Sequence, residues 1–207
     1  NSAGFMVVSG EIGCGKTTLI RHLLNNLAPS LTVGLVYNTH REIPNLLEWI
    51  MLALGLPYDG MSRVALFDGF QRFLIEQYGV GKTVLLIIDE AQNLSPDALE
   101  SLRMLSNINA DKNQLLQIML VGQPQLKEML MRPDLLQFSQ RVEAAFHIKP
   151  FAAADVPNYI EHRWAIPLRA AISNAGGFAL EDTWVHPAEL AVAGALTLVL
   201  ATAGVLL

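Results

Sequence analysis

The 207-residue sequence predicts an α/β fold, a three-layer α/β/α sandwich built on a mainly parallel five-stranded sheet. Two observations carry this prediction. Short apolar runs alternate along the chain with helical patterns, and such alternation is typical of right-handed crossovers between parallel strands. Three of the runs are almost continuously apolar, as in strands that are buried on both faces. The expected strands are Phe5–Ser9, Thr32–Tyr37, Val84–Ile88, Leu115–Val121 and Val142–Ile148.

The expected helices have recognisable beginnings and ends. A proline suits the first helical turn because it has no N–H to leave unpaired, and a glycine suits the stop. Pro44 and Gly55 bound one helix in this way, Gly79 ends another, and Ser95-Pro96 provides an N-cap followed by a first-turn proline. The expected helices are Thr17–Leu27, Pro44–Leu54, Val64–Tyr78 and a fourth that runs from Pro96 to Ser106.

Composition excludes several classes of protein. The chain has 14 Lys+Arg and 19 Asp+Glu, a formal charge of −5, and is 52% apolar. This balance argues against a disordered chain and against a generic DNA binder, although it leaves room for a local basic patch. The single cysteine excludes an internal disulfide framework and a multi-cysteine zinc site.

Residues 10–17 match the phosphate-binding pattern G-x-x-x-x-G-K-S/T at every position, between an expected strand and an expected helix. Glycines allow the backbone N–H groups to point at phosphates beside the positive end of the helix. Lys16 is expected to reach the β- and γ-phosphates, and the Thr17 hydroxyl to ligate Mg²⁺. Thr18 is expected on the α-phosphate side. The whole set of phosphate-binding candidates is Gly10, Glu11, Ile12, Gly13, Cys14, Gly15, Lys16, Thr17 and Thr18.

Cys14 occupies a variable position of this loop and has two interpretations. A helix N-terminus lowers the pKa of a nearby thiol, so Cys14 is a candidate redox-sensitive residue. Alternatively, it is a small residue that the loop tolerates. Alkylation with and without nucleotide separates the two.

An acidic pair, Asp89 and Glu90, directly follows the apolar strand Val84–Ile88. The carboxyl ends of parallel strands form the ligand-binding edge of an open α/β sheet. Asp89 is therefore expected to hold Mg²⁺, and Glu90 to polarise the attacking water. Taken alone, the pair also fits a solvated strand end, and the phosphate loop favours the catalytic interpretation.

Three segments together resemble a known family. They are residues 89–94 (Asp-Glu-Ala-Gln-Asn-Leu), 102–107 (Leu-Arg-Met-Leu-Ser-Asn) and 120–124 (Leu-Val-Gly-Gln-Pro). In order and spacing they are similar to the general secretion pathway protein A (ExeA-like) and exosortase-locus ATPases, members of the AAA+ division of P-loop ATPases. The resemblance covers roughly residues 4–165 and implies ATP and Mg²⁺ as ligands, ATP hydrolysis, and a homo-oligomer.

The resemblance also implies roles for further residues. Gln123 matches the sensor-1 position that contacts the γ-phosphate or the water; alternatively, it is a turn residue before Pro124. Arg141 matches an arginine that acts as a finger across a subunit boundary; the alternative is a surface arginine at a helix end, and Arg103 and Arg132 are weaker rivals for the finger. Gln92 matches a position linked to a partner or to the nucleotide state.

The resemblance ends before the C-terminus. We expect an ATPase core over 1–165 and a divergent segment over 166–207, in which Gly176-Gly177 leads into Phe178 and not into the Pro-Arg of a second sensor. Residues 190–207 carry no charge, and as a helix they would extend ~27 Å, close to a bilayer core. This segment is a membrane anchor, a buried terminal helix, or a gene end that has lost the usual lid.

The sequence therefore predicts an ATPase that powers or regulates assembly of a secretion system at the cell envelope. Envelope secretion components are the expected partners, and the cytoplasm or the inner face of the cytoplasmic membrane is the expected location. Two alternatives remain: a DNA-associated AAA+ ATPase of the transposition-regulator type, and a nucleotide-gated switch with little turnover. Glu90→Gln separates an enzyme from a switch, and salt-dependent DNA binding tests the regulator.

Overall fold

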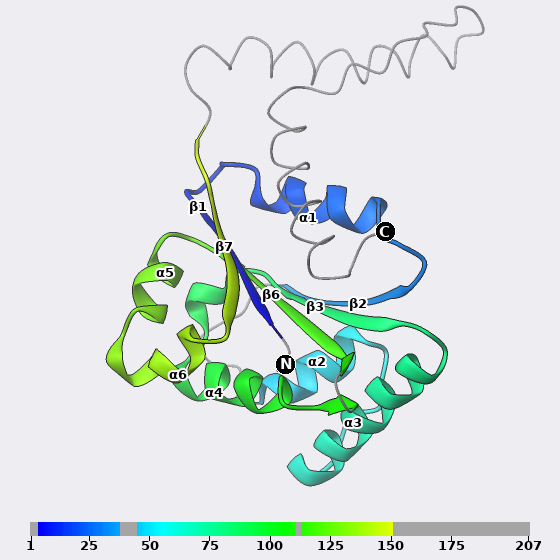
Figure 1. Cartoon of the computed structure of the whole chain (residues 1–207). Coiled ribbons are helices and arrows are strands. Elements are labelled where there is room, and N and C mark those ends of the chain that lie inside the picture. Colours follow the sequence, from blue (N-terminus) through cyan, green and yellow to red (C-terminus); the bar gives the residue numbers. More distant parts are fainter. Residues whose placement is uncertain (1–3, 38–44, 111–112, 151–207) are drawn as a thin grey trace, which may run out of the picture.

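The computed structural model describes residues 4–37, 45–110 and 113–150 (Figure 1). At its centre is a parallel sheet of five strands in the order β2-β3-β6-β1-β7. This arrangement confirms the predicted α/β class and each expected strand to within one or two residues. The strands are β1 (Phe5–Gly10), β2 (Leu31–Val36), β3 (Thr83–Ile88), β6 (Leu116–Gly122) and β7 (Val142–Ile148).

The three inner strands are buried almost throughout, whereas the edge strands are half-buried. Exposure alternates along β7, from Glu143 to His147, as expected of a strand with one neighbour and two unequal faces. The continuous apolar runs of β1, β3 and β6 follow from this placement, because both of their faces lie under helices or loops.

Helices lie on both sides of the sheet, with α1 on one side and the remaining helices on the other (Figure 1). Two 3-10 turns, η1 (Ala91–Asn93) and η2 (Pro133–Leu135), and a small antiparallel pair, β4 (Asn109–Ala110) with β5 (Asn113–Gln114), complete the described part. The helices are α1 (Lys16–Asn25), α2 (Leu46–Ala53), α3 (Arg63–Gly79), α4 (Pro96–Leu105), α5 (Gln125–Leu130) and α6 (Leu136–Ser139).

Alternate strand residues supply two separate hydrophobic clusters. Met6 and Val8 of β1 join the cluster under α1, which includes Ile20. Phe5 and Val7 point the other way and join the larger cluster under α2, α3 and α4. Each fully buried side chain of this size stabilises the fold by about 1.5–3 kcal/mol. The strand period of two thus holds both helical layers against one sheet.

Helix boundaries follow local chemistry closely. Ser95 Oγ accepts from the Ala98 N–H at 3.1 Å, which confirms the predicted N-cap of α4. Gly55 is left-handed with φ 70° directly after α2, as a helix stop requires. α3 ends at Gly79, as predicted, and the left-handed residue follows two positions later at Gly81, with φ 75°.

Several predictions lie outside the described residues. They are the domain boundary at 165, the missing second sensor at 176–178 and the apolar helix over 190–207. The expected helix start at Pro44 is two residues too early, because α2 begins at Leu46 and Asn45 is its extended N-cap. Within the described ranges, no helix has both the length and the apolar character needed to cross a bilayer.

Candidate functional site

The phosphate loop joins the carboxyl end of β1 to the first turn of α1. Gly13 and Gly15 have φ values of 80° and 98°, in the left-handed region that side chains disfavour. Gly15 is the N-cap of α1, so the unpaired N–H groups of the helix start lie directly beside the loop. Thr17 and Thr18 are exposed on this first turn. The turn at the predicted anion-binding loop is therefore shaped by left-handed glycines and leads into a helix start that has no side-chain cap.

Lys16 is the buried cation of the loop. Its side chain is folded back, and Nζ donates to the carbonyl oxygens of Gly10 and Glu11 at 2.9 Å each. Only 7% of the residue is exposed. A buried ammonium group requires acceptors, and here the loop itself supplies them. Phosphate oxygens are the same kind of acceptor and carry a compensating charge.

Gly10 is required by close packing. A Cβ at Gly10 would lie 2.5 Å from Cys14 Sγ and 2.9 Å from the Ile148 carbonyl oxygen. Cys14 is itself buried, with 6% exposure, so its thiol fills the space that Gly10 leaves. Gly10 and the Cys14 side chain therefore pack directly against each other.

Asp89 continues the line of β3 and is buried. Its N–H donates to the Val36 carbonyl at 2.9 Å, and its Oδ1 accepts from the Glu90 N–H at 2.9 Å. Desolvation by burial raises the pKa of this carboxyl; the Glu90 charge adds to the increase, while the Glu90 N–H and the Lys16 ammonium oppose it. Asp89 is thus a poorly hydrated carboxylate within the field of a lysine.

Glu90 has the backbone conformation φ 53°, ψ 37°, which makes it the one non-glycine residue with positive φ among those described. Left-handed backbone costs an ordinary side chain roughly 1–2 kcal/mol and concentrates at functional sites. The conformation turns the chain sharply into η1 after the strand, and the Glu90 carboxylate remains half-buried at the edge of the sheet.

Gln123 lies beside this carboxylate at the end of β6. Gln123 Nε2 is 3.4 Å from Glu90 Oε2, and the Gln123 N–H donates to Gln92 Oε1 at 2.9 Å. Gln92 Nε2 in turn donates to Glu90 Oε2 at 2.5 Å. The sheet order explains this meeting, because β6 lies between β1 and β3 and all three strands end at the same edge.

Arg141 does not join this group. Arg141 directly precedes β7, whose first residue Val142 pairs with Phe5 at the start of β1. Arg141 therefore lies at the amino ends of these parallel strands, whereas the phosphate loop lies at their carboxyl ends. Arg141 Nη1 donates to Ser106 Oγ at 2.8 Å, to Asn107 Oδ1 at 2.7 Å and to the Arg103 carbonyl at 3.2 Å.

The rival arginines have carboxylate partners. Arg132 forms a bidentate pair with Asp134, and Arg103 pairs with Glu100. The Arg103 hydrogen bond lowers the pKa of Glu100.

One residue of the site, Gly122, was not predicted: a Cβ there would lie 2.6 Å from Gln92 Oε1. The sequence feature that could have identified Gly122 is a glycine placed between a buried strand and a polar residue.

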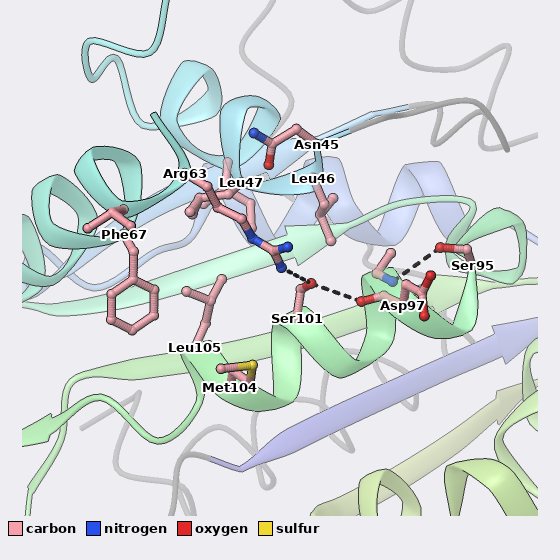
Figure 2. Close-up of a pocket in the computed structure, with 13 residues that line it drawn as sticks. Asn45, Leu46, Leu47, Arg63, Phe67, Ser95, Asp97, Ser101, Met104 and Leu105 are labelled. Atoms are coloured by element: carbon pink, nitrogen blue, oxygen red, sulfur yellow. Dashed lines mark hydrogen bonds between the residues drawn. The ribbon is translucent and has the colours of Figure 1, made fainter. Parts of the chain in front are cut away.

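A groove of about 830 Å³ lies elsewhere, between α2, α3 and α4 (Figure 2). Arg63 crosses it and donates to Ser101 Oγ at 3.3 Å, while Ser101 Oγ donates to the Asp97 carbonyl at 2.8 Å. Leu47, Phe67 and Met104 supply part of its apolar wall. None of the predicted site residues lines this groove.

The residues present fit Mg²⁺. Asp89 offers a carboxylate and Thr17 a hydroxyl, and oxygen donors of these kinds are those that Mg²⁺ prefers when phosphate oxygens and water complete its shell. The buried Asp89 carboxylate is a favourable neighbour for a cation, since burial has removed much of its hydration.

Comparisons with known proteins agree with this geometry. Residues 1–130 match the family model described as AAA domain. The chain is 38% identical over 164 residues to the general secretion pathway protein A of Aeromonas hydrophila, a match that covers 79% of this chain and 30% of that protein. The chain thus spans less than a third of that relative.

Two solved structures show the same fold. The Aeropyrum pernix ORC2 protein in its ADP form has a TM-score of 0.62 at 17% identity, covering 95% of this chain and 52% of that one. The Aeropyrum pernix ORC1 protein in complex with DNA has a TM-score of 0.56 at 16% identity, covering 84% and 50%. Together with the phosphate loop and the acidic pair, the family match places this chain in the AAA domain family of P-loop ATPases.

Proposed function

We propose that this chain binds MgATP and hydrolyses it to ADP and phosphate. One observation carries the proposal: the Lys16 loop, Gln123 and the Asp89–Glu90 pair stand at the carboxyl ends of three adjacent strands, β1, β6 and β3. A nucleotide on the loop would extend its terminal phosphate along this edge. Lys16 would exchange its carbonyl partners for the β- and γ-phosphates.

In the proposed reaction, water attacks the γ-phosphorus in line as the bond to the β–γ bridging oxygen breaks. Glu90 accepts the proton of the water, and ADP departs with the bridging oxygen. Gln123 lies within reach of Glu90 and would orient the water or the γ-phosphate. Thr17 and Asp89 would hold Mg²⁺, which supplies charge neutralisation of the phosphates when bound.

The proposal includes a homo-oligomer in which Arg141 serves the site of a neighbouring copy. Seven residues of β7, at ~3.3 Å each, separate Arg141 from the nucleotide edge of its own chain. Arg141 is therefore too far away to contact a γ-phosphate bound to its own chain. It could contact a γ-phosphate bound to another copy if an interface placed the two side by side. Arg141 would have to leave Ser106 and Asn107 to act there.

The biological setting is also a proposal. The 38% identity to a general secretion pathway protein supports assembly or export at the cell envelope, with secretion components as partners. The cytoplasm, or the cytoplasmic face of the inner membrane, is then the proposed location. The Aeropyrum pernix ORC1 structure that contains DNA shares the fold at 16% identity, which supports the fold alone.

The test combines turnover with binding. Wild-type chain should release phosphate from ATP only with Mg²⁺, and Glu90→Gln should lower turnover by about 10²–10⁴-fold while fluorescent ATP still binds. Lys16→Ala should lose binding, and Lys82→Ala, an exposed lysine, should match wild type. Tight binding without turnover in the wild type would favour a switch. Salt-dependent DNA binding that ATP modulates would favour the regulator instead.

A further inference from the structure

Gln92 uses both ends of its side-chain amide within the candidate site. Nε2 donates to Glu90 Oε2 at 2.5 Å, and Oε1 accepts from the Gln123 N–H at 2.9 Å. An amide that is held at its oxygen has its nitrogen aimed in a fixed direction, because the group is planar. Through these two hydrogen bonds, Gln92 connects the end of β6 to the Glu90 carboxylate.

The surroundings are shaped to accept this side chain. Gly122 precedes Gln123, and a Cβ at Gly122 would lie 2.6 Å from Gln92 Oε1 and 3.3 Å from the Gln92 backbone nitrogen. Any larger residue would push the amide out of the bond to Gln123. The chain therefore uses a glycine where the strand end must approach Gln92 closely.

Glu90 has particular need of a positioning partner. Its backbone is left-handed and lies at the turn after β3, outside any helix or strand that would position the side chain against a neighbouring residue of the same element. Its side chain is half-buried, and two amide nitrogens, from Gln92 and Gln123, converge on the same oxygen, Oε2. Hydrogen bonds to a carboxylate are charge-assisted and directional.

From these contacts we infer that Gln92 is a positioning residue: it fixes the Glu90 carboxylate relative to the end of β6, where Gln123 stands. This inference rests on the proposed function, since it assigns Gln92 a part in hydrolysis through Glu90. It makes the geometry of Glu90 depend on β6, so that a ligand that shifts Gln123 also shifts Glu90. Gln92 itself touches neither nucleotide nor water in this role.

The first measurement is kinetic. Gln92→Leu keeps the size of the side chain and removes both hydrogen bonds, and kcat should fall by about 10–100-fold while KM and the affinity for fluorescent ATP stay within about twofold. Gln71→Leu, the same change on the exposed face of α3, should match wild type. An unchanged kcat in Gln92→Leu, or a loss of affinity equal to the loss of kcat, would overturn the inference.

Whether the effect of Gln92 depends on Glu90 is tested by making the same substitution in the Glu90→Ala variant. In Glu90→Ala there is no carboxylate to position, so adding Gln92→Leu should leave the residual single-turnover rate unchanged. A further loss of the same size as in the wild-type background would mean that Gln92 acts independently of Glu90. Absence of turnover in the wild type would remove the proposed hydrolysis, and full turnover in Glu90→Ala would remove the role of Glu90 in it; either result would overturn the inference as well.

A third measurement needs no nucleotide. In ¹⁵N-labelled full chain, the side-chain NH₂ signal of Gln92 is identified by its loss in Gln92→Leu. In Glu90→Ala it should move toward the position of a solvated glutamine, and it should not move in Gln71→Leu. An identical signal with and without the Glu90 carboxylate would contradict the contact on which the inference stands.

Gly122→Ala provides an independent route if Gln92→Leu fails to fold. The added methyl displaces the Gln92 amide without removing it, and it should reproduce the loss of kcat. In a Gln92→Ala background the same methyl meets no side-chain amide, so the loss should disappear, apart from small adjustments against Leu126 at 3.1 Å and the backbone nitrogen of residue 92 at 3.3 Å. Equal losses in both backgrounds would assign the effect to backbone packing and overturn the inference.

Discussion

The guanidinium of Arg141 donates to the side-chain oxygen of Asn107 at 2.7 Å, at the C-terminal end of α4. The same nitrogen reaches Ser106 Oγ and the Arg103 carbonyl. A cation at this end of a helix donates to carbonyl groups that have no intrahelical partner, and it interacts favourably with the negative end of the helix dipole. In the isolated chain Arg141 therefore links α4 to β7.

Arg141→Ala should have two separable effects. Loss of the link should lower the free energy of unfolding by about 1–2 kcal/mol, measured by urea denaturation of the nucleotide-free chain. If Arg141 also completes the site of a neighbouring copy, turnover should rise with protein concentration in the wild type and fall by about 10³-fold or more in the variant.

Asn107→Ala is the matched control. It removes one acceptor and leaves the guanidinium in place, so stability should decrease while concentration-dependent turnover is retained. Turnover of Arg141→Ala that equals that of Asn107→Ala, at concentrations where both are folded, would contradict the finger and leave Arg141 with a structural role.

Gly10→Ala should destabilise the phosphate loop by about 1–3 kcal/mol through overpacking. The added carbon would lie 2.5 Å from Cys14 Sγ and 2.9 Å from the Ile148 carbonyl oxygen. Adding Cys14→Ala should recover part of this loss, because it removes the nearer atom, and the remainder should persist at Ile148. Thermal denaturation of the two single variants and the double variant gives the coupling free energy between the two substitutions.

The same contact bears on the reactivity of Cys14. With 6% of the residue exposed, its thiol should react with iodoacetamide far more slowly in the folded chain than in urea. Rapid alkylation in the native state, blocked by ATP, would instead favour the redox-sensitive interpretation.

Asp89→Asn should stabilise the nucleotide-free chain at pH 7. Burial raises the pKa of Asp89 in the folded state, so wild-type stability is fully present below the unfolded-state pKa and is lost as the pH rises through the folded-state pKa. The advantage of the variant should therefore shrink on acidification and vanish below both values. Urea denaturation across this range measures it, with Asp59→Asn, an exposed turn residue, as control.

The same variant should lose the stabilisation that MgATP gives. Removing Mg²⁺ with EDTA should lower the melting temperature of the ATP-bound wild type and leave that of Asp89→Asn unchanged. A variant that keeps a magnesium-dependent shift would remove Asp89 from the proposed metal site.

Ser95→Ala should cost about 1 kcal/mol of stability, because the Ala98 N–H at the start of α4 loses its acceptor. Ser62→Ala should cost a similar amount at α3, where Ser62 Oγ accepts from the Ala65 N–H at 3.2 Å. Ser30→Ala, an exposed serine before β2, provides the reference for serine removal itself. Equal stability of all three variants would contradict the capping assignment.

Local sequence signals predicted a large part of this molecule. β1, β3 and β6 were predicted almost to the residue because strands buried on both faces must be apolar throughout. The small β4–β5 pair and the helices α5 and α6 carry no comparable signal, since each is at most six residues long. Gly81 and not Gly79 ends the turn after α3, because either glycine satisfies the pattern and only the path into β3 selects one.

By itself, the sequence determined the α/β class, the phosphate loop and the acidic pair, because each depends on residues that are neighbours along the chain. Only the tertiary structure decided which distant groups share the site. Gln92 and Gln123 are 31 positions apart and meet because β6 pairs with β3. Arg141 is separated from them because its strand begins at the opposite edge of the sheet. Strand order and direction are set by long-range packing, which no local pattern encodes.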